Sequence, residues 1–340
     1  MLSVIIPAYN ASNKIIRCLD SIKSQNIDKL EIIVINDGSV DDTLNKTKKY
    51  AAFNPSLNIK VIHQNNSGAA ASRNKGIEIA QGDYIFFVDA DDFLIPNSLQ
   101  KVVDIINESK PDIIYFDYFH YYINDNYTYI KNHDEMFSNI NDDLIAHSTA
   151  PWLMIIKKEL INKYNFKFPN LPAYEDYGSL PFLGSVAQNV IYFDKPIYVY
   201  SQEDYSIMRA KSKKFDKKYL LIIDATNNLI QLFGNDYINN QALEYTIMRE
   251  LVINGCQRID CCEDKNRKEI INAQREICDY FTHYFPNWRN NLYFQKSKYS
   301  FKLLFYLTIN NLYKLKHFIL YLSKQKYKIK CYLLKSEEIK

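Results

Sequence analysis

The sequence predicts an α/β fold in which a mostly parallel sheet is flanked by helices and followed by a helical C-terminal region. Over residues 1 to about 120, short β-branched runs alternate with helical patterns, which is typical of a parallel sheet covered by helices. Polar clusters follow several of these runs directly, and ligands bind at such strand ends in open α/β sheets. After Lys211 helical patterns dominate to the end of the chain. We therefore expect a sheet domain of residues 1–210 and a helical region of residues 211–340.

Five strands and four helices are expected in the first 120 residues. The expected strands are Leu2–Pro7, Glu31–Asn36, Ile59–His63, Tyr84–Asp89 and Asp112–Phe116. The expected helices are Ser12–Ser24, Thr43–Ala51, Ser72–Ala80 and Asn97–Glu108, the last introduced by Pro96 as a helix-entry signal. Because the carboxyl ends of parallel strands and the amino ends of the helices converge, the polar clusters should share one edge of the sheet.

Residues 121–210 are expected to complete the same domain. Residues 121–150 are polar and irregular, which indicates an exposed insertion. From Pro151 to about Arg209, short strands such as Val190–Phe193 and Ile197–Tyr200 alternate with proline-containing loops. This stretch does not read as a free-standing domain, so the sheet domain has two parts, about 1–120 and about 121–210.

The composition is that of a folded globular protein. Hydrophobic residues make up 47% and charged residues 24% of the 340 residues, which gives no sign of disorder. The six cysteines form no CxxC pair and no Cys/His cluster with zinc spacing, so reduced thiols are expected. The N-terminal apolar run is short and ends at Pro7, and no run of 18 uncharged apolar residues occurs, so neither a signal peptide nor a spanning helix is expected. A cytoplasmic location follows as an expectation.

The segment GDYIFFVDADDFLIP is the most informative one, because an apolar strand ends in three carboxylates, Asp89, Asp91 and Asp92. Carboxylates this close together repel one another, and a divalent cation would neutralise them. Hard oxygen ligands suit Mg²⁺ or Mn²⁺ bound jointly by protein and phosphate. The alternative from the residues alone is a solvated acidic turn or a helix cap before Pro96.

Two further segments suggest ligand contacts at the same edge. In EIIVINDGSVDDT, Asp37 follows a buried strand and could accept a hydrogen bond from a uracil N3–H; the alternative is an Asp-Gly turn with Asp42 capping the next helix. In NNSGAAASRNKGI, small residues allow close backbone approach, and Arg73 could meet a diphosphate. The alternative for this segment is a small-residue helix start that packs on the sheet and needs no ligand.

Five segments, taken in order, resemble the family 2 glycosyltransferases, which have the GT-A nucleotide-sugar-binding fold, a Rossmann-like sheet flanked by helices. The segments are SVIIPAYNASNKIIRCLDSIKSQ, EIIVINDGSVDDT, NNSGAAASRNKGI, GDYIFFVDADD and YEDYGSLPFLGSVA. The resemblance implies that residues 1–120 are the donor half of a catalytic domain and residues 121–210 the acceptor half.

The resemblance implies contacts to the nucleotide base for three residues. Pro7 and Tyr9 match positions that contact the base, Tyr9 by stacking, and Asp37 matches the carboxylate that binds it. The family usually has a second acid where this chain has Asn36, which implies altered contacts to the base.

The resemblance also implies contacts to the rest of the donor. Asp89 matches the first carboxylate of a DxD motif, near the ribose, and Asp91 matches the ligand of a Mn²⁺ or Mg²⁺ ion on the diphosphate, with Asp89 as the second expected metal ligand. Arg73 matches a recurrent arginine of the family. Arg209 lies in a segment that resembles the loop that closes over bound donor and could reach the diphosphate, although any exposed polar loop with an arginine would look similar.

On the acceptor side, Glu175 and Asp176 match a Glu-Asp pair of which the second residue is the usual catalytic base. Glu175 is expected near the acceptor, or as a helix N-terminal acid favoured by the macrodipole. Trp152 matches a tryptophan that Asn and Lys often follow in the family, whereas Leu153 and Met154 follow it here. Trp152 is expected to be an acceptor-sugar platform, with a buried core tryptophan as the alternative.

The implied reaction is metal-dependent transfer of a hexosyl or N-acetylhexosaminyl group from a nucleotide sugar, with UDP preferred, to an acceptor hydroxyl of a growing bacterial glycan, with inversion. The implied partners are the donor and a glycan or lipid-linked acceptor. No nucleic acid is expected, because no recognition motif accompanies the basic charge of the chain. One alternative is a nucleotidyltransferase, which would need a glycine-rich phosphate loop where this chain has PAYNAS. Another is a catalytically degenerate sugar-binding or scaffold protein.

The C-terminal tail carries the basic excess of the chain. The net charge is +3, yet residues 296–340 contain eleven lysines and two glutamates. In FKLLFYLTINNLYKLKHFILYLS, apolar residues recur at three- and four-residue spacing, which aligns Phe305, Ile309, Leu312, Leu315, Ile319 and Leu322 along one helical face. A basic amphipathic helix on anionic lipid at the inner face of the cell membrane is one interpretation. The other is a helix packed on the catalytic domain or on a second copy of the chain.

Overall fold

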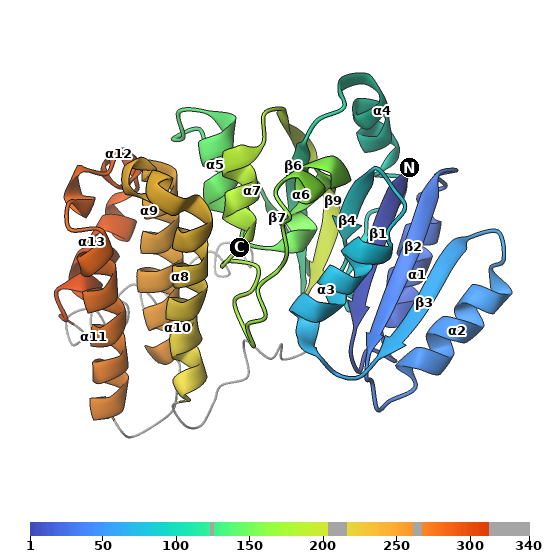
Figure 1. Ribbon diagram of the computed structural model, residues 1–340, viewed down its shortest axis with the longest axis horizontal. Coiled ribbons are helices and arrows are strands. Elements are labelled where there is room, and N and C mark those ends of the chain that lie inside the picture. Colours follow the sequence, from blue (N-terminus) through green and yellow to red (C-terminus); the bar gives the residue numbers. More distant parts are fainter. Residues whose placement is uncertain (123–125, 203–215, 261–266, 313–340) are drawn as a thin grey trace, which may run out of the picture. The chain divides into compact units, whose positions relative to one another are not determined.

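Figure 1 shows the computed structural model, which describes residues 1–122, 126–202, 216–260 and 267–312. The chain divides into two compact units, one of Met1–Ala210 with Asp224–Thr246 and the other of Lys211–Ile223 with Ile247–Lys340. Residues 224–246 come from the region that the sequence presents as helical, and they belong to the unit that contains the sheet. Thr226 and Ala225 of this stretch pack against the turn between Tyr174 and Ser179, which carries Asp176.

One half of the sheet is parallel, as its β-branched runs predict. β3 (Asn58–Gln64), β2 (Leu30–Asp37), β1 (Leu2–Ala8) and β4 (Tyr84–Phe87) lie side by side in this order and pair in parallel. β1 and β2 are buried along nearly their whole length, since helices cover both faces of the sheet. The four strands predicted here are confirmed, with ends within two residues of the predicted ones.

The four helices predicted between these strands are also confirmed. They are α1 (Ile15–Lys23), α2 (Thr43–Phe53), α3 (Gly68–Ile79) and α4 (Gln100–Ser109). Alternate residues of β1 face opposite sides of the sheet, so Val4 and Ile6 pack in the core with α1, whereas Ile5 packs in the core with α3. α3 lies very close to β1 at Gly76, where a Cβ atom would meet Cγ2 of Ile5 at 2.3 Å.

The other half of the sheet is mixed. β8 (Met154–Lys157) pairs antiparallel with β4, and β6 (Ile113–Tyr122) pairs antiparallel with β8 and parallel with β9 (Val190–Ser201). β5 (Phe93–Leu94) pairs antiparallel with β9, and β7 (Asn126–Ile130) pairs antiparallel with β6. Together the described residues form one sheet of nine strands. α5 (Ile140–His147), α6 (Lys158–Lys163) and α7 (Leu180–Val186) contribute to the core on the α3 side.

Several expectations for residues 121–210 are wrong. The described part of the stretch expected to be an irregular insertion contains β7 and α5, because β7 gains its partner by folding back on β6. The two short strands expected at 190–193 and 197–200 are one strand, β9, whose register shifts opposite Asp117. β8 is absent from the predicted strands, since a run of four residues carries no period that separates strand from helix.

The second unit is helical. It contains a π-helical segment, Met248–Gly255, together with α10 (Cys256–Asp260), α11 (Arg267–Tyr284), α12 (Leu292–Lys296) and α13 (Tyr299–Ile309). α8 (Leu221–Phe233) and α9 (Gln241–Ile247) each contribute residues to both units.

The expected amphipathic tail is described only in its first part. Phe305 of α13 is fully buried against Trp288 and Phe281, with ring centroids 4.9 and 5.6 Å away. α13 ends at Ile309, and Asn311 takes a left-handed φ of 57°, so the single helix expected from 301 to 322 is interrupted here. The start of the apolar face therefore packs inside the second unit. Leu315, Ile319 and Leu322 lie outside the described residues.

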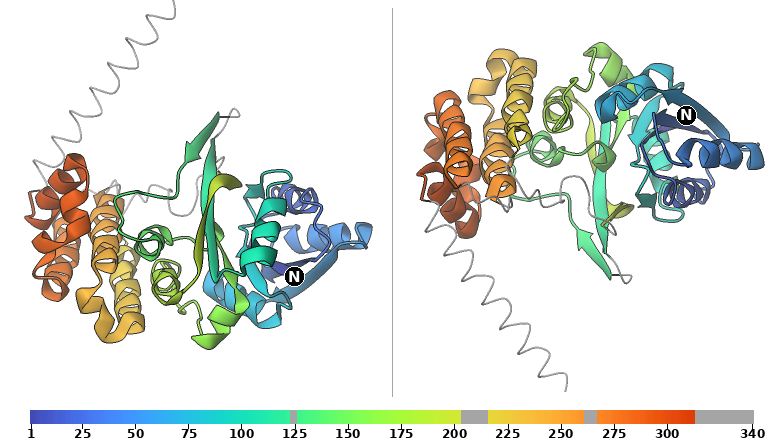
Figure 2. Two further views of the ribbon diagram at one scale, coloured as in Figure 1. Left: turned by 90° about the horizontal axis from the view of Figure 1, so that it is seen from above. Right: turned by 90° about the horizontal axis from the view of Figure 1, so that it is seen from below.

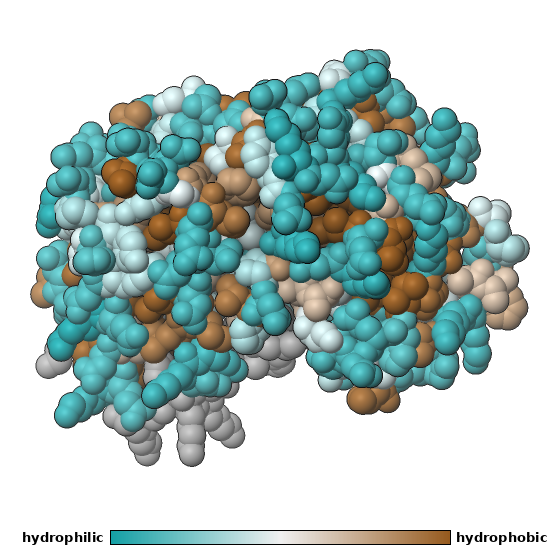
Figure 3. All heavy atoms as spheres, in the orientation of Figure 1, coloured by the Kyte–Doolittle hydropathy of each residue, from teal (hydrophilic) through white to brown (hydrophobic). Residues whose placement is uncertain are grey.

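No helix in the part of the chain that the structure describes is both long enough and apolar enough to cross a lipid bilayer. On the face shown in Figure 3, hydrophilic residues predominate and hydrophobic ones lie scattered between them. Scattered apolar residues are normal on a folded protein.

Candidate active site

A cavity of about 430 Å³ opens at the carboxyl ends of β1, β2 and β4. Its lining includes six residues that the sequence singles out as ligand contacts: Pro7, Tyr9, Asp37, Arg73, Asp89 and Asp91. They come from the ends of three parallel strands and from the first turns of α3, which is where an open α/β sheet binds its ligands. The expectation that the polar clusters share one edge is therefore confirmed. We call this cavity the strand-end cavity.

Asp37 is held at the wall of the strand-end cavity by the start of α3. One carboxylate oxygen accepts from the Ser67 N–H and from Nε2 of Gln64, and the other accepts from the Gly68 N–H, each at 2.8 Å. These contacts explain why α3 begins four residues before its predicted start, since Asp37 satisfies N–H groups that a helix leaves free. Gly38 follows with a left-handed φ of 70°, as a tight turn requires.

Asn36 and Tyr9 differ in how far they reach the cavity. Asn36 is fully buried, and its side-chain nitrogen lies 2.8 Å from Nδ1 of His63 on the neighbouring strand. Tyr9 is 49% exposed, so one side of its ring is available to a ligand. The ring is thus positioned for stacking, whereas Asn36 is engaged within the sheet.

Two of the three carboxylates after β4, Asp91 and Asp92, lie in different environments. Asp91 is exposed at the strand-end cavity, and its carboxylate accepts no hydrogen bond from the described residues. Asp92 is buried and accepts from the Tyr198 hydroxyl at 2.6 Å and from the Ser201 N–H at 2.7 Å. Burial, together with the charges of Asp91 and Asp89, raises the pKa of Asp92 well above its ordinary value. Asp92 therefore ties this turn to β9 and does not face a ligand.

Sequence reasoning missed two residues that fix the same turn. The Tyr198 hydroxyl accepts the Asp89 N–H at 3.1 Å while donating to Asp92. Arg17 donates to the backbone oxygen of Asp91 at 2.8 Å, and its guanidinium lies 4.7 Å from the Phe93 ring centre. Tyr198 stands 109 residues from Asp89 in the sequence, so no local pattern could have revealed this contact.

Arg73 is a buried bridge between carboxylates. Its side chain is 7% exposed, with one terminal nitrogen 2.6 Å from Glu175 and the other 3.5 Å from Asp89. Its Nε is buried without a hydrogen-bond partner among the described residues. The two ends of the guanidinium thus bind carboxylates of the chain, where the sequence suggested a diphosphate. Arg73 connects the strand-end cavity to the turn that carries Asp176.

Asp176 lies on a turn between Tyr174 and Ser179 that several contacts hold in place. Tyr174 takes a left-handed φ of 64°, and the Ser179 hydroxyl donates to the Glu175 backbone oxygen at 2.6 Å. The Tyr177 hydroxyl lies 3.0 Å from Oγ1 of Thr226 on α8, and a Cβ atom on Gly178 would be 3.1 Å from Ala225. Residues 224–246 therefore support the turn, a role that the sequence did not suggest.

The surroundings of Asp176 favour its protonated form. Burial, and next the charge of Glu175, raise the pKa of Asp176 to about 7, while the charge of Arg73 and a hydrogen bond from the Tyr177 N–H oppose the shift. Burial also raises the pKa of Asp89, against the lowering effect of Arg73. A carboxylate with a pKa near neutral pH is suited to exchange a proton during a reaction.

Trp152 lies in the core. Its side chain lies parallel to the rings of Tyr198 and Tyr200, with centroids 4.6 and 5.3 Å away, and edge-on to Tyr118 at 4.9 Å. The residue is only 8% exposed. This geometry supports the core alternative, because little of the ring remains for a sugar; contact with an acceptor stays a prediction. Arg209, the remaining donor-side candidate, lies outside the described residues.

The carboxylates at the strand-end cavity fit a divalent cation that the protein and a diphosphate would bind jointly. Asp91 offers an exposed carboxylate, and the Asp89 side chain is 29% exposed beside it. Proteins bind Mg²⁺ through one or two carboxylates together with substrate phosphates and water. Among the described residues no group of three or more His, Cys, Asp or Glu side chains could hold a metal ion by itself. Phosphate oxygens would thus have to complete the coordination.

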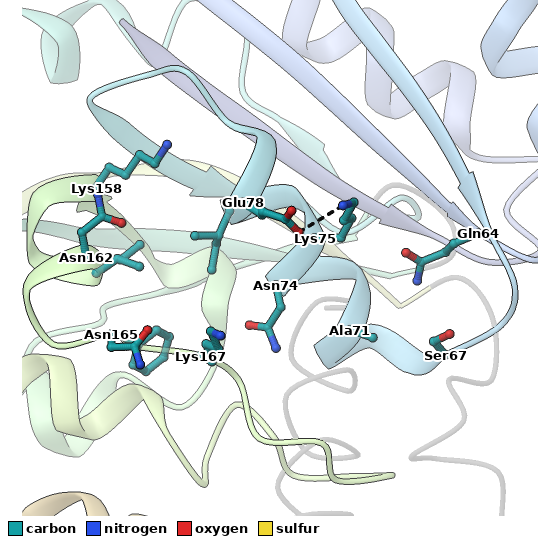
Figure 4. Close-up of a pocket in the computed structure, with 13 residues that line it drawn as sticks. Gln64, Ser67, Ala71, Asn74, Lys75, Glu78, Lys158, Asn162, Asn165 and Lys167 are labelled. Carbon is teal, nitrogen blue, oxygen red and sulfur yellow. Dashed lines mark hydrogen bonds and ion pairs between the residues drawn. The ribbon is translucent and has the colours of Figure 1, made fainter.

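Figure 4 shows a second cavity, of about 730 Å³, on the other side of α3. Side chains from α3 and α6 line it, among them Lys75, Glu78 and Lys158. Glu78 supplies the one carboxylate in its lining, and Lys75 pairs with it at 3.0 Å. Although this cavity is larger, its lining has a single carboxylate, which is paired with Lys75, whereas three carboxylates line the strand-end cavity, so the strand-end cavity is the candidate active site.

Comparison with known proteins agrees with this geometry. The family model for glycosyl transferase family 2 matches residues 3–171. Glycosyltransferase GlyG of Streptococcus pneumoniae is 30% identical over 227 residues, which cover 62% of this chain and 74% of GlyG. The uncharacterized glycosyltransferase YibD of Escherichia coli is 27% identical over 305 residues, which cover 83% of this chain and 84% of YibD.

The fold is also that of a solved structure. The crystal structure of S. aureus TarS 1–349 matches 93% of this chain and 90% of its own length with a TM-score of 0.67, at 19% identity. The GT-A fold expected from the sequence is thereby confirmed. With the family match over residues 3–171 and the identity to GlyG, these findings show that the chain belongs to the family 2 glycosyltransferases.

Proposed function

We propose that the chain transfers a sugar from a UDP-sugar to a hydroxyl of a bacterial glycan, with inversion at the anomeric carbon. The observation that carries this proposal is the position of Arg73, which binds Asp89 at the strand-end cavity and Glu175 beside Asp176. A donor in the cavity would lie next to a carboxylate whose pKa is about 7. Donor site and base are thus joined by one buried side chain.

The walls of the strand-end cavity suit a uridine nucleotide. The half-exposed ring of Tyr9 would stack on the base, with Pro7 beside it. Asp37 accepts three hydrogen bonds, and a carboxylate can accept about four, so one lone pair remains for a uracil N3–H. Asp91 and Asp89 would hold a Mn²⁺ or Mg²⁺ ion, which when bound stabilises negative charge on the leaving diphosphate.

Asp176 would act as the general base. The acceptor hydroxyl gives its proton to the Asp176 carboxylate as its oxygen attacks the anomeric carbon, and the bond from that carbon to the diphosphate breaks in the same displacement. Such a base must stand within about 3 Å of the hydroxyl. Glu175 and Arg73 would keep the carboxylate in place, and no covalent intermediate is required.

Thermal shift with nucleotide sugars tests donor binding. A ligand at 100 times its dissociation constant stabilises a protein by about 2.7 kcal/mol. We expect UDP-N-acetylglucosamine and UDP-glucose with Mn²⁺ to raise the melting temperature more than GDP- or dTDP-sugars. UDP-N-acetylglucosamine is the first nucleotide sugar to test, because TarS, which shares the fold, has been solved in complex with it. A panel in which no nucleotide sugar shifts the melting temperature, together with no UDP release, would contradict the proposal and favour a degenerate binding protein.

Membrane contact by the tail is a separate proposal, supported by its eleven lysines and its apolar spacing. Because Phe305 is part of the core of the second unit, the truncated chain should end at Leu312 and keep α13. Full-length protein should sediment with anionic liposomes at low salt, whereas the truncated chain should not. Equal recovery of both in the supernatant would leave the packing or dimer interpretation. Sedimentation of the full-length protein alone would favour a lipid-linked acceptor.

A further inference from the structure

The β6–β7 hairpin and its neighbours place five aromatic side chains on one face of the sheet. Phe119 pairs with Tyr129 and Tyr121 with Tyr127 across the hairpin. On the other side, Phe119 pairs with Val199 of β9, and Val199 pairs with Phe93 of β5. Residues opposite each other on adjacent strands share a face, and residues two apart on one strand do as well. Figure 2 shows β6 and β7 side by side, extending away from the rest of the sheet.

These side chains form a continuous row of rings. Centroids are 5.8 Å apart for Phe93 and Tyr121, 4.9 Å for Tyr121 and Tyr127, 6.0 Å for Tyr127 and Phe119, and 5.7 Å for Phe119 and Tyr129. Tyr127 is 51% and Tyr129 48% exposed. The Tyr129 hydroxyl donates to the Asp117 carboxylate, which fixes the orientation of its ring. We call this row the aromatic face.

The opposite face of the same strands is different. Tyr118 lies edge-on to Trp152 at 4.9 Å, and His120 lies 5.4 Å from Tyr200. Trp152 belongs to a core cluster and Tyr118 and Tyr200 pack against it. Core packing therefore explains Tyr118 and Tyr200, but it does not explain Tyr127 and Tyr129 of the aromatic face, which are about half exposed.

The inner end of the aromatic face is linked to the candidate active site through Arg17. Phe93 is two residues from Asp91, and Arg17 covers its ring at 4.7 Å while donating to the Asp91 backbone oxygen. From Phe93 to Tyr129 the row crosses three strand spacings, about 14 Å. A chain-like ligand on the row would thus end beside the carboxylate that lines the strand-end cavity.

We infer that the aromatic face binds the carbohydrate chain of the acceptor and directs its end to the active site; this inference rests on the proposed glycosyl transfer. Sugar rings have apolar C–H faces that stack on aromatic rings and hydroxyls that tyrosine hydroxyls can meet, and tyrosine offers both surfaces in one side chain. None of the five residues is charged, and Arg17, which covers Phe93, donates to the Asp91 backbone oxygen, so the row itself offers rings and hydroxyls to a ligand and no charge. Its continuity with the strand-end cavity favours the acceptor over an unrelated partner.

Full-length protein on a printed array of bacterial surface oligosaccharides tests the inference. Wild-type protein should bind at least one oligosaccharide, and Tyr127→Ala should bind it about tenfold more weakly, which corresponds to about 1.4 kcal/mol. Tyr127→Phe keeps the ring and loses the hydroxyl, so its binding should be weakened less than that of Tyr127→Ala. Tyr122→Ala is the matched control, because Tyr122 is an exposed tyrosine of the same hairpin on the opposite face. Melting temperatures check that each variant is folded.

Three outcomes would overturn the inference. Equal binding by Tyr127→Ala and Tyr122→Ala would remove the difference between the two faces. Binding of no oligosaccharide by a wild type that releases UDP from a UDP-sugar would show that the enzyme works without such a surface. Binding to phosphatidylcholine vesicles alone, lost in Tyr127→Ala, would assign the face to a membrane. Failure of wild-type protein to release UDP from any donor would instead count against the proposed function.

Discussion

The parallel and mixed halves of the sheet contribute different chemistry to the candidate active site. The parallel half supplies Asp37, Asp89 and Asp91, which lie at or just beyond the carboxyl ends of β2 and β4. The mixed half supplies aromatic side chains and the long-range bonds from Tyr198 and Ser201 that hold the DxD turn. The first half is thus suited to a charged donor, and the second to an acceptor with apolar and hydroxyl surfaces.

The two halves meet at Arg73. This residue lies on α3, in the parallel half, and its side chain contacts residues of both halves. It binds Asp89 of the parallel half and Glu175, which lies beyond β8. The turn of Asp176 depends in addition on Thr226 and Ala225 of α8. The junction therefore brings together three stretches of sequence, whereas Asp37, Asp89 and Asp91 all come from the first.

The largest effect on activity is expected from a substitution in the parallel half, at Asp91. Asp91→Asn should reduce transfer to background and weaken Mn²⁺-dependent UDP binding, because it removes a charged ligand with little change in shape. Turnover and isothermal titration with UDP and Mn²⁺ measure both effects. Asp28→Asn is a suitable control, since Asp28 is exposed and precedes β2 at the opposite end of the strands. Wild-type turnover in Asp91→Asn would show that the metal assignment is wrong.

Asp176→Asn should affect the rate and spare the donor. We expect kcat to fall by about two to four orders of magnitude, the usual contribution of a general base, with UDP affinity unchanged. Asp194→Asn serves as the control, since Asp194 is an exposed acid on β9. If Asp176→Asn lost donor binding as much as rate, the separation between the two halves would not hold.

A smaller effect is expected from pH alone. The base acts in its deprotonated form, and the pKa of Asp176 is raised to about 7, so protonation should remove activity as pH falls through that value. We expect kcat/KM to drop about tenfold for each pH unit below 7 and to level off above 8. The residual rate of Asp176→Asn should lack this inflection. A wild-type profile flat between pH 5 and 8 would contradict the assigned base.

The parallel half could be predicted from sequence because its determinants are local. Each strand is an apolar run, and each site residue follows its run directly, so the pattern alone places Asp37, Asp89 and Asp91 at one edge. The mixed half depends on pairings between distant segments, such as β4 with β8 and β6 with β9. For the same reason the roles of Asp92 and Arg73 could not be predicted. Asp92 looks like Asp91 in sequence, and what sets it apart is its burial and its hydrogen bonds from Tyr198 and Ser201, both distant in the chain.

The smallest effect is expected from a substitution of Trp152. This substitution tests whether Trp152 is a core residue or part of the acceptor site. Its parallel contacts with Tyr198 and Tyr200 and its 8% exposure support packing as its role. Trp152→Phe should then cost on the order of 1 kcal/mol of stability, a fall in melting temperature of about 2–4 °C, through the smaller ring. Trp288→Phe is the matched control, because Trp288 is 2% exposed and lies in the core of the second unit. If both variants lose stability and keep the acceptor KM of wild type, Trp152 is a core residue. A several-fold rise in acceptor KM in Trp152→Phe alone would restore the sugar platform and extend the acceptor site to both faces of β6.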